Sequence, residues 1–180
     1  MVTIAHRGST RPHPENSIEA LVYAMHKGVD AIEVDVRQTK DGAFFLLHDS
    51  KLQRLFSLDR EIADMVAKDV AQLSYTDFPE IKITKLESAL ARIDGCCNLL
   101  LHVKEGGEAL RGLVDILDSH NYTLKSIIGI TTVEDLKLLK AFAPNYRTLG
   151  FIPDLDSIDS FLDNGVDIIR LWDQWVSEKY

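Results

Sequence analysis

Residues 31–36 read Ala-Ile-Glu-Val-Asp-Val, and this stretch decides the fold. Its apolar positions are nearly continuous, which is typical of a short strand that is buried on both faces in a parallel sheet. Glu33 and Asp35 are two residues apart, so their side chains point to the same face of that strand. Two carboxylates this close on a buried face are costly unless they are protonated or neutralised by a cation. The stretch therefore predicts either a divalent metal site or ion-paired carboxylates at a sheet edge.

Six further apolar runs alternate with stretches of helical periodicity, which is the pattern of βα units around a parallel sheet. We predict strands at 2–5, 31–36, 43–47, 99–103, 126–130, 148–152 and 167–171, and helices at 17–27, 84–93, 107–120, 133–142 and 156–164. Residues 50–78 are more mixed, and we expect a loop with one short helix there. Seven strands at this spacing leave two architectures open: a doubly wound sheet and a (β/α)8 barrel that lacks its eighth unit.

Two of the predicted helices carry clear boundary signals. Gly28 follows the helix at 17–27 as a C-terminal stop. Thr84, with Glu87 three residues later, forms the pattern of a capping box at the start of the helix at 84–93.

The overall composition is that of a single globular domain, which we assign to residues 1–180. Hydrophobic residues make up 46% and charged residues 27% of the 180 positions. The formal net charge of −8 has the wrong sign for binding nucleic acid or anionic lipid, so a small-molecule substrate is expected. No apolar stretch approaches the roughly 20 residues that cross a bilayer, and no basic leader precedes the first strand, so we expect a cytoplasmic protein. Cys96 and Cys97 are adjacent, which predicts a reduced pair.

Histidines and cations follow the predicted strands at their carboxyl ends, where parallel α/β folds collect their chemistry. His6 and Arg7 follow the first strand, and His48 follows the strand at 43–47. His102 and Lys104 share one face of the strand that begins at residue 99. A lone histidine in an apolar strand is more often a core residue than a ligand, but the neighbouring lysine makes the two interpretations of His102 comparable. Two histidines, a carboxylate pair and two cations together match a site that cleaves phosphoesters.

Four short motifs in the first 49 residues carry a family resemblance. They are His-Arg-Gly at 6–8, Pro-Glu-Asn-Ser at 14–17, Glu-Val-Asp-Val at 33–36 and His-Asp at 48–49. In this order and at these spacings they resemble the signature of the glycerophosphodiester phosphodiesterase family. A looser similarity continues through residues 83–87, 99–104 and 165–169.

The resemblance implies a (β/α)8 barrel that uses a divalent metal to hydrolyse a glycerophosphodiester to glycerol 3-phosphate and an alcohol. It assigns acid/base roles to two histidines, phosphate binding to two cations and metal ligation to two carboxylates; these pairs are His6 and His48, Arg7 and Lys104, and Glu33 and Asp35. It also assigns Glu15 to the lining of the site and Asn16 to its support. On local chemistry alone, Glu15 and Asn16 instead indicate the N-cap region of the helix that begins near Ser17.

One position departs from the family pattern and changes the expected metal. The family ordinarily has a glutamate two residues before the lysine, where this sequence has His102. The resemblance implies Mg²⁺ or Ca²⁺, whereas a neutral imidazole in place of a carboxylate favours Mn²⁺ or Zn²⁺. Three outcomes stay open: a changed metal preference, a weakly held metal with reduced activity, and a site without metal.

The length of the chain is the second departure from the family. A closed barrel needs an eighth strand and helix after the strand at 167–171, so we expect either a longer natural chain or a partner that closes the sheet. Trp172 and Trp175 follow that strand. We assign Trp172 to the substrate mouth, with a core or rim role as the alternative for both tryptophans.

Three other functions are compatible with parts of the sequence. A non-catalytic phosphodiester-binding or regulatory domain could share the scaffold, although the paired histidines favour an enzyme. A phospholipase D-like enzyme that forms a cyclic phosphate would share the first half of the site. A membrane-surface enzyme is disfavoured by the net charge of −8. We expect no stable membrane association, and either a monomer or a homo-oligomer is compatible with the sequence.

Overall fold

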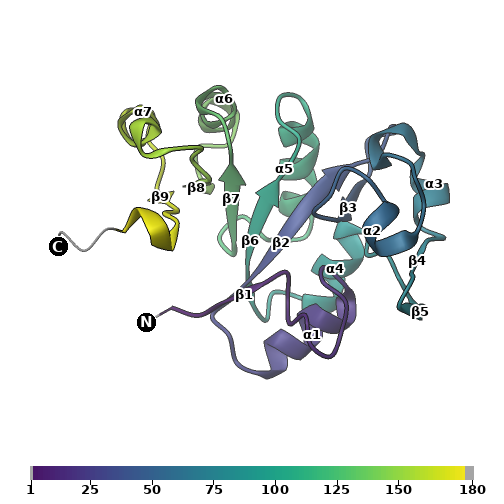
Figure 1. Ribbon diagram of the computed structural model, residues 1–180. Helices are drawn as coiled ribbons and strands as arrows, with labels where there is room; N and C mark the ends of the chain where they lie inside the picture. The colour runs from purple at the N-terminus through teal and green to yellow at the C-terminus, as the bar shows by residue number, and fades with distance from the viewer. Residues whose placement is uncertain (1, 177–180) are drawn as a thin grey trace.

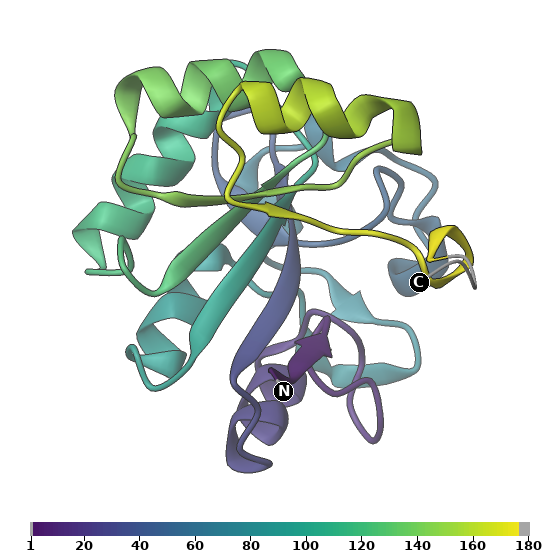
Figure 2. The ribbon, with the colours of Figure 1, turned by 90° about the vertical axis from the view of Figure 1, so that its left-hand side faces the viewer.

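The computed structural model describes residues 2–176 and contains a seven-stranded sheet in which six strands run parallel. In spatial order they are β1 (Ile4–His6), β2 (Ala31–Gln38), β6 (Asn98–Val103), β7 (Ser126–Ile130), β8 (Arg147–Gly150) and β9 (Ile168–Ile169) (Figure 1). This order follows the chain in one direction, as in a barrel, whereas a doubly wound sheet reverses its order at a switch point. The sheet also curls (Figure 2). The barrel prediction is therefore confirmed, in the form of an incomplete barrel.

The strand predicted at 43–47 is not one of the parallel strands. It is β3 (Phe44–Leu46), which pairs antiparallel to β2 with Val36 opposite Leu46. The two strands are joined by a tight turn in which the Thr39 carbonyl accepts a hydrogen bond from the Gly42 amide, and a parallel partner would need a much longer crossover. The count of seven barrel strands was therefore wrong: the described residues supply six, two units short of eight rather than one.

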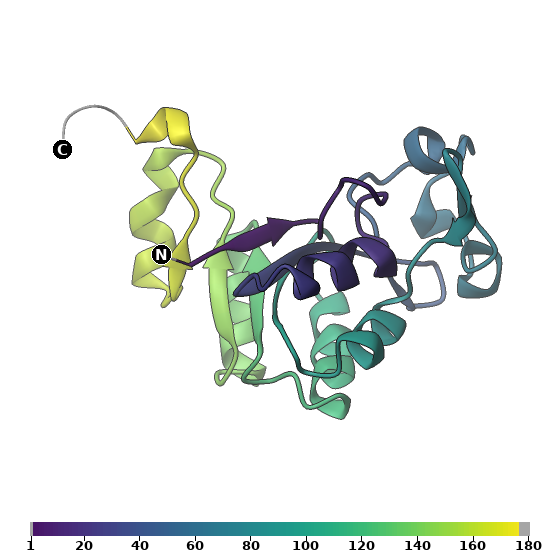
Figure 3. The ribbon, with the colours of Figure 1, turned by 90° about the horizontal axis from the view of Figure 1, so that it is seen from below.

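Five helices cover the outer, convex face of the sheet (Figures 2 and 3). They are α1 (Ile18–His26), α4 (Leu86–Ile93), α5 (Ala109–Ser119), α6 (Val133–Phe142) and α7 (Ile158–Asp163), all within the predicted ranges. Alternate strand residues such as Ile32, Val34 and Leu101 belong to the hydrophobic core beneath these helices. Because side chains alternate along a strand, Glu33 and Asp35 face the opposite, concave side.

The capping box predicted at Thr84 does not form. The N-cap of α4 is Lys85, whose side chain makes no capping hydrogen bond, and Glu87 pairs with the Lys85 ammonium at 2.8 Å. The Thr84 hydroxyl instead accepts a hydrogen bond from the Ile18 amide at the first turn of α1, at 3.1 Å. Such a cap between distant segments depends on tertiary packing, which a local motif does not contain.

A second, smaller hydrophobic cluster is formed by β3 and the segment that follows it up to residue 83, at the end of the molecule opposite residues 173–175 (Figure 3). This segment contains α2 (Gln53–Phe56), the 3-10 helix η1 (Ile62–Asp64), α3 (Ala67–Val70) and the hairpin of β4 (Ser74–Tyr75) and β5 (Phe78–Lys82). The prediction of one short helix at 50–78 therefore underestimated its structure. The remaining elements are η2 (Leu155–Ser157) and η3 (Asp173–Trp175).

Both outer strands of the sheet have a free edge among residues 2–176, because β1 pairs only with β2 and β9 only with β8. Large apolar side chains are exposed at these edges: Ile4 is 47% accessible, Leu171 44% and Trp172 47%. A closed barrel has no such edges.

The state of the two cysteines and the length of the helices follow directly from the structure. Cys96 is exposed and Cys97 buried, and both are free thiols, as predicted for a reduced pair. Among residues 2–176, every helix is too short or too polar to cross a membrane.

Candidate active site

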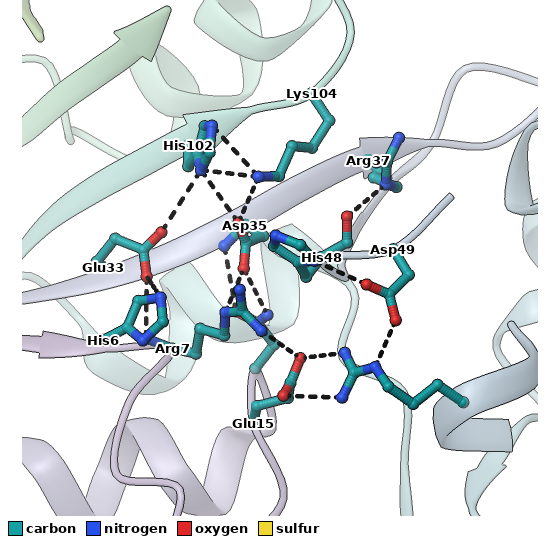
Figure 4. Close-up of polar contacts among 12 residues, drawn as sticks. His6, Arg7, Glu15, Glu33, Asp35, Arg37, His48, Asp49, His102 and Lys104 are labelled. Carbon is teal, nitrogen blue, oxygen red and sulfur yellow. Dashed lines mark hydrogen bonds and ion pairs between the residues drawn. The ribbon is translucent and has the colours of Figure 1, made fainter. Parts of the chain in front are cut away.

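A cavity of about 570 Å³ opens on the concave face of the sheet, around the carboxyl ends of its strands. Its lining consists of Ile4, His6, Arg7, Glu33, Asp35, His48, Leu100, His102, Thr131, Leu149, Phe151, Ile152, Arg170 and Trp172. Seven of the ten residues predicted for the site are in this lining. The other three, Glu15, Asn16 and Lys104, are not part of the lining but contact Arg7 or Asp35, which are. Figure 4 shows the contacts of Glu15 and Lys104.

Strand register brings the three predicted metal ligands together. Asp35 of β2 is directly opposite His102 of β6, and Glu33 lies two residues before Asp35 on the same face. One potential ligand atom from each of these side chains lies within 4.8 Å of the others. A carboxylate pair with an imidazole is a donor set that suits a divalent cation such as Mn²⁺ or Zn²⁺.

Asp35 is the most heavily contacted member of this triad, and its side chain is 1% accessible. Its Oδ2 lies 3.0 Å from Arg7 Nε and accepts a hydrogen bond from Asn16 Nδ2 at 3.2 Å. The Lys104 ammonium lies 2.8 Å from Oδ1. Burial acts to raise the pKa of Asp35, but contacts with His102 and Lys104 outweigh it and hold the pKa well below its usual range. Asp35 is therefore ionised at neutral pH.

The Asp35 carboxylate also leaves one oxygen that a metal ion would satisfy. Oδ1 is buried and makes no hydrogen bond of good geometry within residues 2–176, although Lys104 Nζ lies 2.8 Å from it and His102 Nδ1 3.2 Å. Buried polar atoms without hydrogen bonds are rare and call for an explanation. Beside Glu33 and His102, this oxygen fits a cation ligand.

Glu33 differs from Asp35 in its environment. Its Oε2 accepts a hydrogen bond from the Arg7 amide at 3.0 Å, and the His6 ring nitrogen Nε2 lies 3.9 Å away. Burial, followed by the charge of Asp35, raises the pKa of Glu33 to about 7. A divalent cation at this position would favour the ionised form of Glu33, because opposite charge lowers the pKa of a carboxyl.

His48 is oriented by the residue that follows it. Its Nδ1 lies 2.7 Å from Asp49 Oδ1, and Asp49 Oδ2 accepts a hydrogen bond from Arg54 Nε. The Arg54 fork also binds both carboxylate oxygens of Glu15, at 2.7 and 3.1 Å. Sequence adjacency alone did not establish the contact between His48 and Asp49, and Arg54 of α2 was missed because it lies in the mixed segment 50–78.

The ion pairs continue from Glu15 to the metal triad. Arg7 Nη1 donates to Glu15 Oε1 at 2.9 Å, while its Nε faces Asp35. Arg7 and Asn16 both have left-handed backbone conformations, with φ of 56° and 58°. We name the six residues Asp35, Arg7, Glu15, Arg54, Asp49 and His48 the ion-pair network; it connects the metal triad with one histidine (Figure 4).

Asn16 is held in this network by two hydrogen bonds to one residue. Its side chain is fully buried and donates to the Asp35 carboxylate, while its Oδ1 accepts from the Asp35 amide at 3.1 Å. Asn16 therefore contacts a predicted metal ligand, whereas the N-cap of α1 is Ser17.

His6 is less constrained than His48. It ends the edge strand β1, its side chain is 72% accessible, and its one charged neighbour within ion-pair range among residues 2–176 is Glu33, at 3.9 Å. Partial desolvation and then the Arg7 charge lower the pKa of His6 below its ordinary value.

An aromatic wall, formed by Phe151 and Trp172, bounds the other side of the cavity. The Phe151 ring stacks on His102, with centroids 3.8 Å apart and planes 14° from parallel. Gly129 makes this possible, because a Cβ at that position would lie 2.3 Å from the Phe151 ring. The Arg170 guanidinium lies 3.5 Å from the centroid of the Trp172 ring.

Trp172 lines the same cavity as the other predicted site residues, and so do Phe151 and Arg170, which sequence reasoning did not single out. Both follow strand ends, at 147–150 and 168–169, so the carboxyl-end rule contained a usable signal. Trp175, for which a core role was the alternative, packs partly buried against the main hydrophobic core.

Comparison with known proteins gives one consistent result. Residues 6–152 match the model of the Glycerophosphoryl diester phosphodiesterase family. A glycerophosphodiester phosphodiesterase of Bacillus subtilis (strain 168) is 30% identical over 195 residues, covering 96% of this chain and 66% of that protein. One from Bacillus altitudinis is 30% identical over 105 residues, covering 56% of this chain and 43% of that protein.

Solved structures agree with the fold. A glycerophosphodiester phosphodiesterase from Agrobacterium tumefaciens str. C58 superposes with a TM-score of 0.76 at 20% identity, over 94% of this chain and 86% of that one. One from Thermotoga maritima gives 0.73 at 26% identity, over 91% and 68% of the two chains. The chain spans 43% and 30% of the lengths of two of its curated relatives. On the match over residues 6–152, the chain belongs to the glycerophosphoryl diester phosphodiesterase family.

Proposed function

We propose that this chain hydrolyses glycerophosphodiesters to glycerol 3-phosphate and an alcohol, with a bound divalent metal. The observation that carries the proposal is the convergence of two histidines and the triad of Glu33, Asp35 and His102 on one cavity. A protein that only bound phosphodiesters would not need a histidine oriented by a carboxylate.

His48 is the proposed general base. Its contact with Asp49 through Nδ1 fixes the tautomer that has its proton on that nitrogen, which leaves Nε2 to accept a proton from the nucleophile. His6 is the proposed general acid and protonates the leaving alkoxide. The anionic phosphate would raise the pKa of His6 again, since an opposite charge favours the imidazolium.

Glu33, Asp35 and His102 are the proposed metal ligands. A bound divalent ion supplies positive charge beside the phosphate. We propose Mn²⁺ or Zn²⁺ over Mg²⁺ or Ca²⁺, because an imidazole is a softer donor than the carboxylate it replaces. The stacked Phe151 ring holds the His102 ring in place.

Arg7 and Lys104 are proposed to act on the phosphate as fixed charges. Both are ion-paired with Asp35, so their positions are set before the substrate binds. Preorganised positive charge stabilises the charge that develops in the transition state. We further propose that the substrate is a small molecule in the cytoplasm.

The test measures release of glycerol 3-phosphate from glycerophosphocholine and glycerophosphoethanolamine by the purified chain, in EDTA and then with Mg²⁺, Ca²⁺, Mn²⁺ or Zn²⁺. Turnover restored best by Mn²⁺ or Zn²⁺ is expected. His48→Ala should lower turnover by about 10²-fold or more, whereas His26→Ala, at an exposed position on α1, should not.

Two results of this assay would contradict the proposal. A folded chain without turnover for any metal would indicate the non-catalytic alternative. A cyclic phosphate as the final product, detected by phosphorus NMR, would indicate internal attack in place of hydrolysis.

A further inference from the structure

Arg170 differs from the other cations around the cavity in its charge balance. Arg7 is paired with Glu15 and Asp35, and Lys104 with Asp35. Arg170 also lines the cavity and is half-buried, yet within residues 2–176 its guanidinium has no carboxylate at ion-pair distance. A partly desolvated cation without a counter-ion is a ready site for an anion.

Arg170 is held by contacts that leave its hydrogen-bond donors available. Its backbone amide donates to the Gly150 carbonyl at 3.0 Å, which continues the pairing of β9 with β8. Its guanidinium carbon lies 3.5 Å from the Trp172 ring centroid and 5.6 Å from that of Phe151. Aromatic rings contact the faces of a guanidinium, whereas its N–H groups point outward in the plane.

The place of Arg170 in the sheet separates it from the two carboxylates of the metal triad, whereas the third member, His102, stacks on the Phe151 ring that Arg170 also approaches. It follows β9, and three strands lie between β9 and β2, which carries Glu33 and Asp35. The cavity surface on this side is otherwise largely apolar, with Leu149 and Ile152. A phosphodiester whose phosphate contacts the triad could therefore extend one of its substituents toward Arg170.

We propose that Arg170, Trp172 and Phe151 form a subsite for the alcohol part of the substrate, and that the preferred alcohol carries a carboxylate or a phosphate. This inference rests on the proposed hydrolysis and specifies its substrate class. A guanidinium binds either anion through two parallel hydrogen bonds. It repels the ammonium of choline or ethanolamine, so diesters of those alcohols are the poorer substrates.

Matched pairs of diesters test the inference, because the two members of each pair differ in one anionic group, a phosphate monoester or a carboxylate. The phosphate pair is glycerophosphoinositol phosphate against glycerophosphoinositol. The carboxylate pair is glycerophospho-N-acetylserine against its methyl ester, and glycerophosphocholine is the cationic case. We expect kcat/KM to be about tenfold higher for the anionic member of at least one pair, which corresponds to about 1.4 kcal/mol. The pair that shows the preference identifies the anion.

Arg170→Gln should remove that preference while leaving the diesters that lack the second anionic group within about twofold of wild type. Arg147→Gln removes a charge at an exposed position of β8 and should leave the preference unchanged. An equal loss for all diesters in Arg170→Gln would show that Arg170 binds the phosphate common to them, and an unchanged preference would show that it binds none of them. Either result overturns the inference.

Calorimetric titration of the same diesters separates this inference from the proposed activity. Absence of turnover with every diester and metal would contradict the hydrolysis. Tighter binding of the anionic member, lost in Arg170→Gln, would still support the subsite. Equal affinities within both pairs would contradict the subsite even in an active enzyme.

Discussion

The two sides of the cavity are built from different interactions. On one side, the ion-pair network connects six charged or titratable side chains between Asp35 and His48. On the other side, the aromatic wall contacts His102 and Arg170 through ring faces. The first side fixes the positions of charges through directed contacts. The second offers a shaped surface with Arg170, a cation that has no carboxylate partner among residues 2–176.

This difference separates two tasks of the proposed enzyme. Buried ion pairs gain little net stability because desolvation offsets their attraction, but removal of one partner is costly since the other charge stays buried. The network therefore fixes the reacting groups. Aromatic surfaces tolerate substitution of their neighbours better, so the aromatic wall is where related substrates would be distinguished.

The largest effect on stability is expected for Asp35→Asn, which breaks the network at its most buried member. It leaves the charges of Arg7 and Lys104 without their shared carboxylate, so the free energy of unfolding in EDTA at neutral pH should fall by about 3–5 kcal/mol. The pKa of Asp35 is depressed, so this difference should be complete above the unfolded pKa of about 3.9 and should decrease as the pH falls below it.

Urea denaturation measures this loss, and Asp59→Asn is the control. The Asp59 carboxylate also faces a lysine, Lys51 at 3.7 Å, but its side chain is 81% accessible. That substitution should change stability by less than about 1 kcal/mol. Equal, small losses in both variants would show that the network carries no more energy than a surface ion pair.

The next effect concerns Gly8, which places the Arg7 end of the network against α1. Gly8 has φ of +75°, and a Cβ there would lie 2.8 Å from the Ala20 carbonyl carbon. Gly28 has nearly the same φ, +74°, with no atom within 4 Å of its Cβ position. Both substitutions to alanine place a side chain at positive φ, at a cost of roughly 1 kcal/mol each. Only Gly8→Ala adds a backbone clash.

Thermal or urea denaturation should therefore show Gly8→Ala to be less stable than Gly28→Ala by about 2 kcal/mol. Gly8→Ala should also reduce turnover at full folding, because it displaces Arg7 from Glu15 and Asp35. Equal stability of the two variants would indicate that the loop after β1 adapts without disturbing the network.

Sequence reasoning located the triad but not the network that supports it. The alternation of Glu33 and Asp35 in an apolar run depends only on strand geometry, so their shared face was predictable. His102 was predicted as a ligand because it stands where the family ordinarily has a glutamate, and the register places it opposite Asp35. The family resemblance added Glu15 and Asn16, whose contacts with Arg54 and Asp35 span 39 and 19 positions.

The fold was predictable to the same extent. Apolar runs and helical periodicity identified the elements, since these patterns are local. The direction of β3 was predicted wrongly, because an apolar run does not indicate whether a strand is parallel or antiparallel to its neighbour. The connection between β2 and β3 is too short for a parallel crossover and could have indicated the antiparallel pairing. Arg54 and Phe151 were missed since their roles arise from contacts with distant segments.

The smallest effect is expected for Arg54→Gln, which changes a member of the ion-pair network that lies outside the cavity. Arg54 touches neither the triad nor the cavity, but it joins Glu15 to Asp49, which orients His48. Loss of the fork should lower kcat by about tenfold with little change in KM, as for residues that orient a catalytic group. Arg60→Gln, at an exposed position in the same segment, should leave both constants unchanged. Rates are compared at saturating substrate with folding checked by circular dichroism, so that lost stability is not counted as lost positioning. A variant with wild-type kcat would show that Asp49 orients His48 without help, and that the network ends at Glu15.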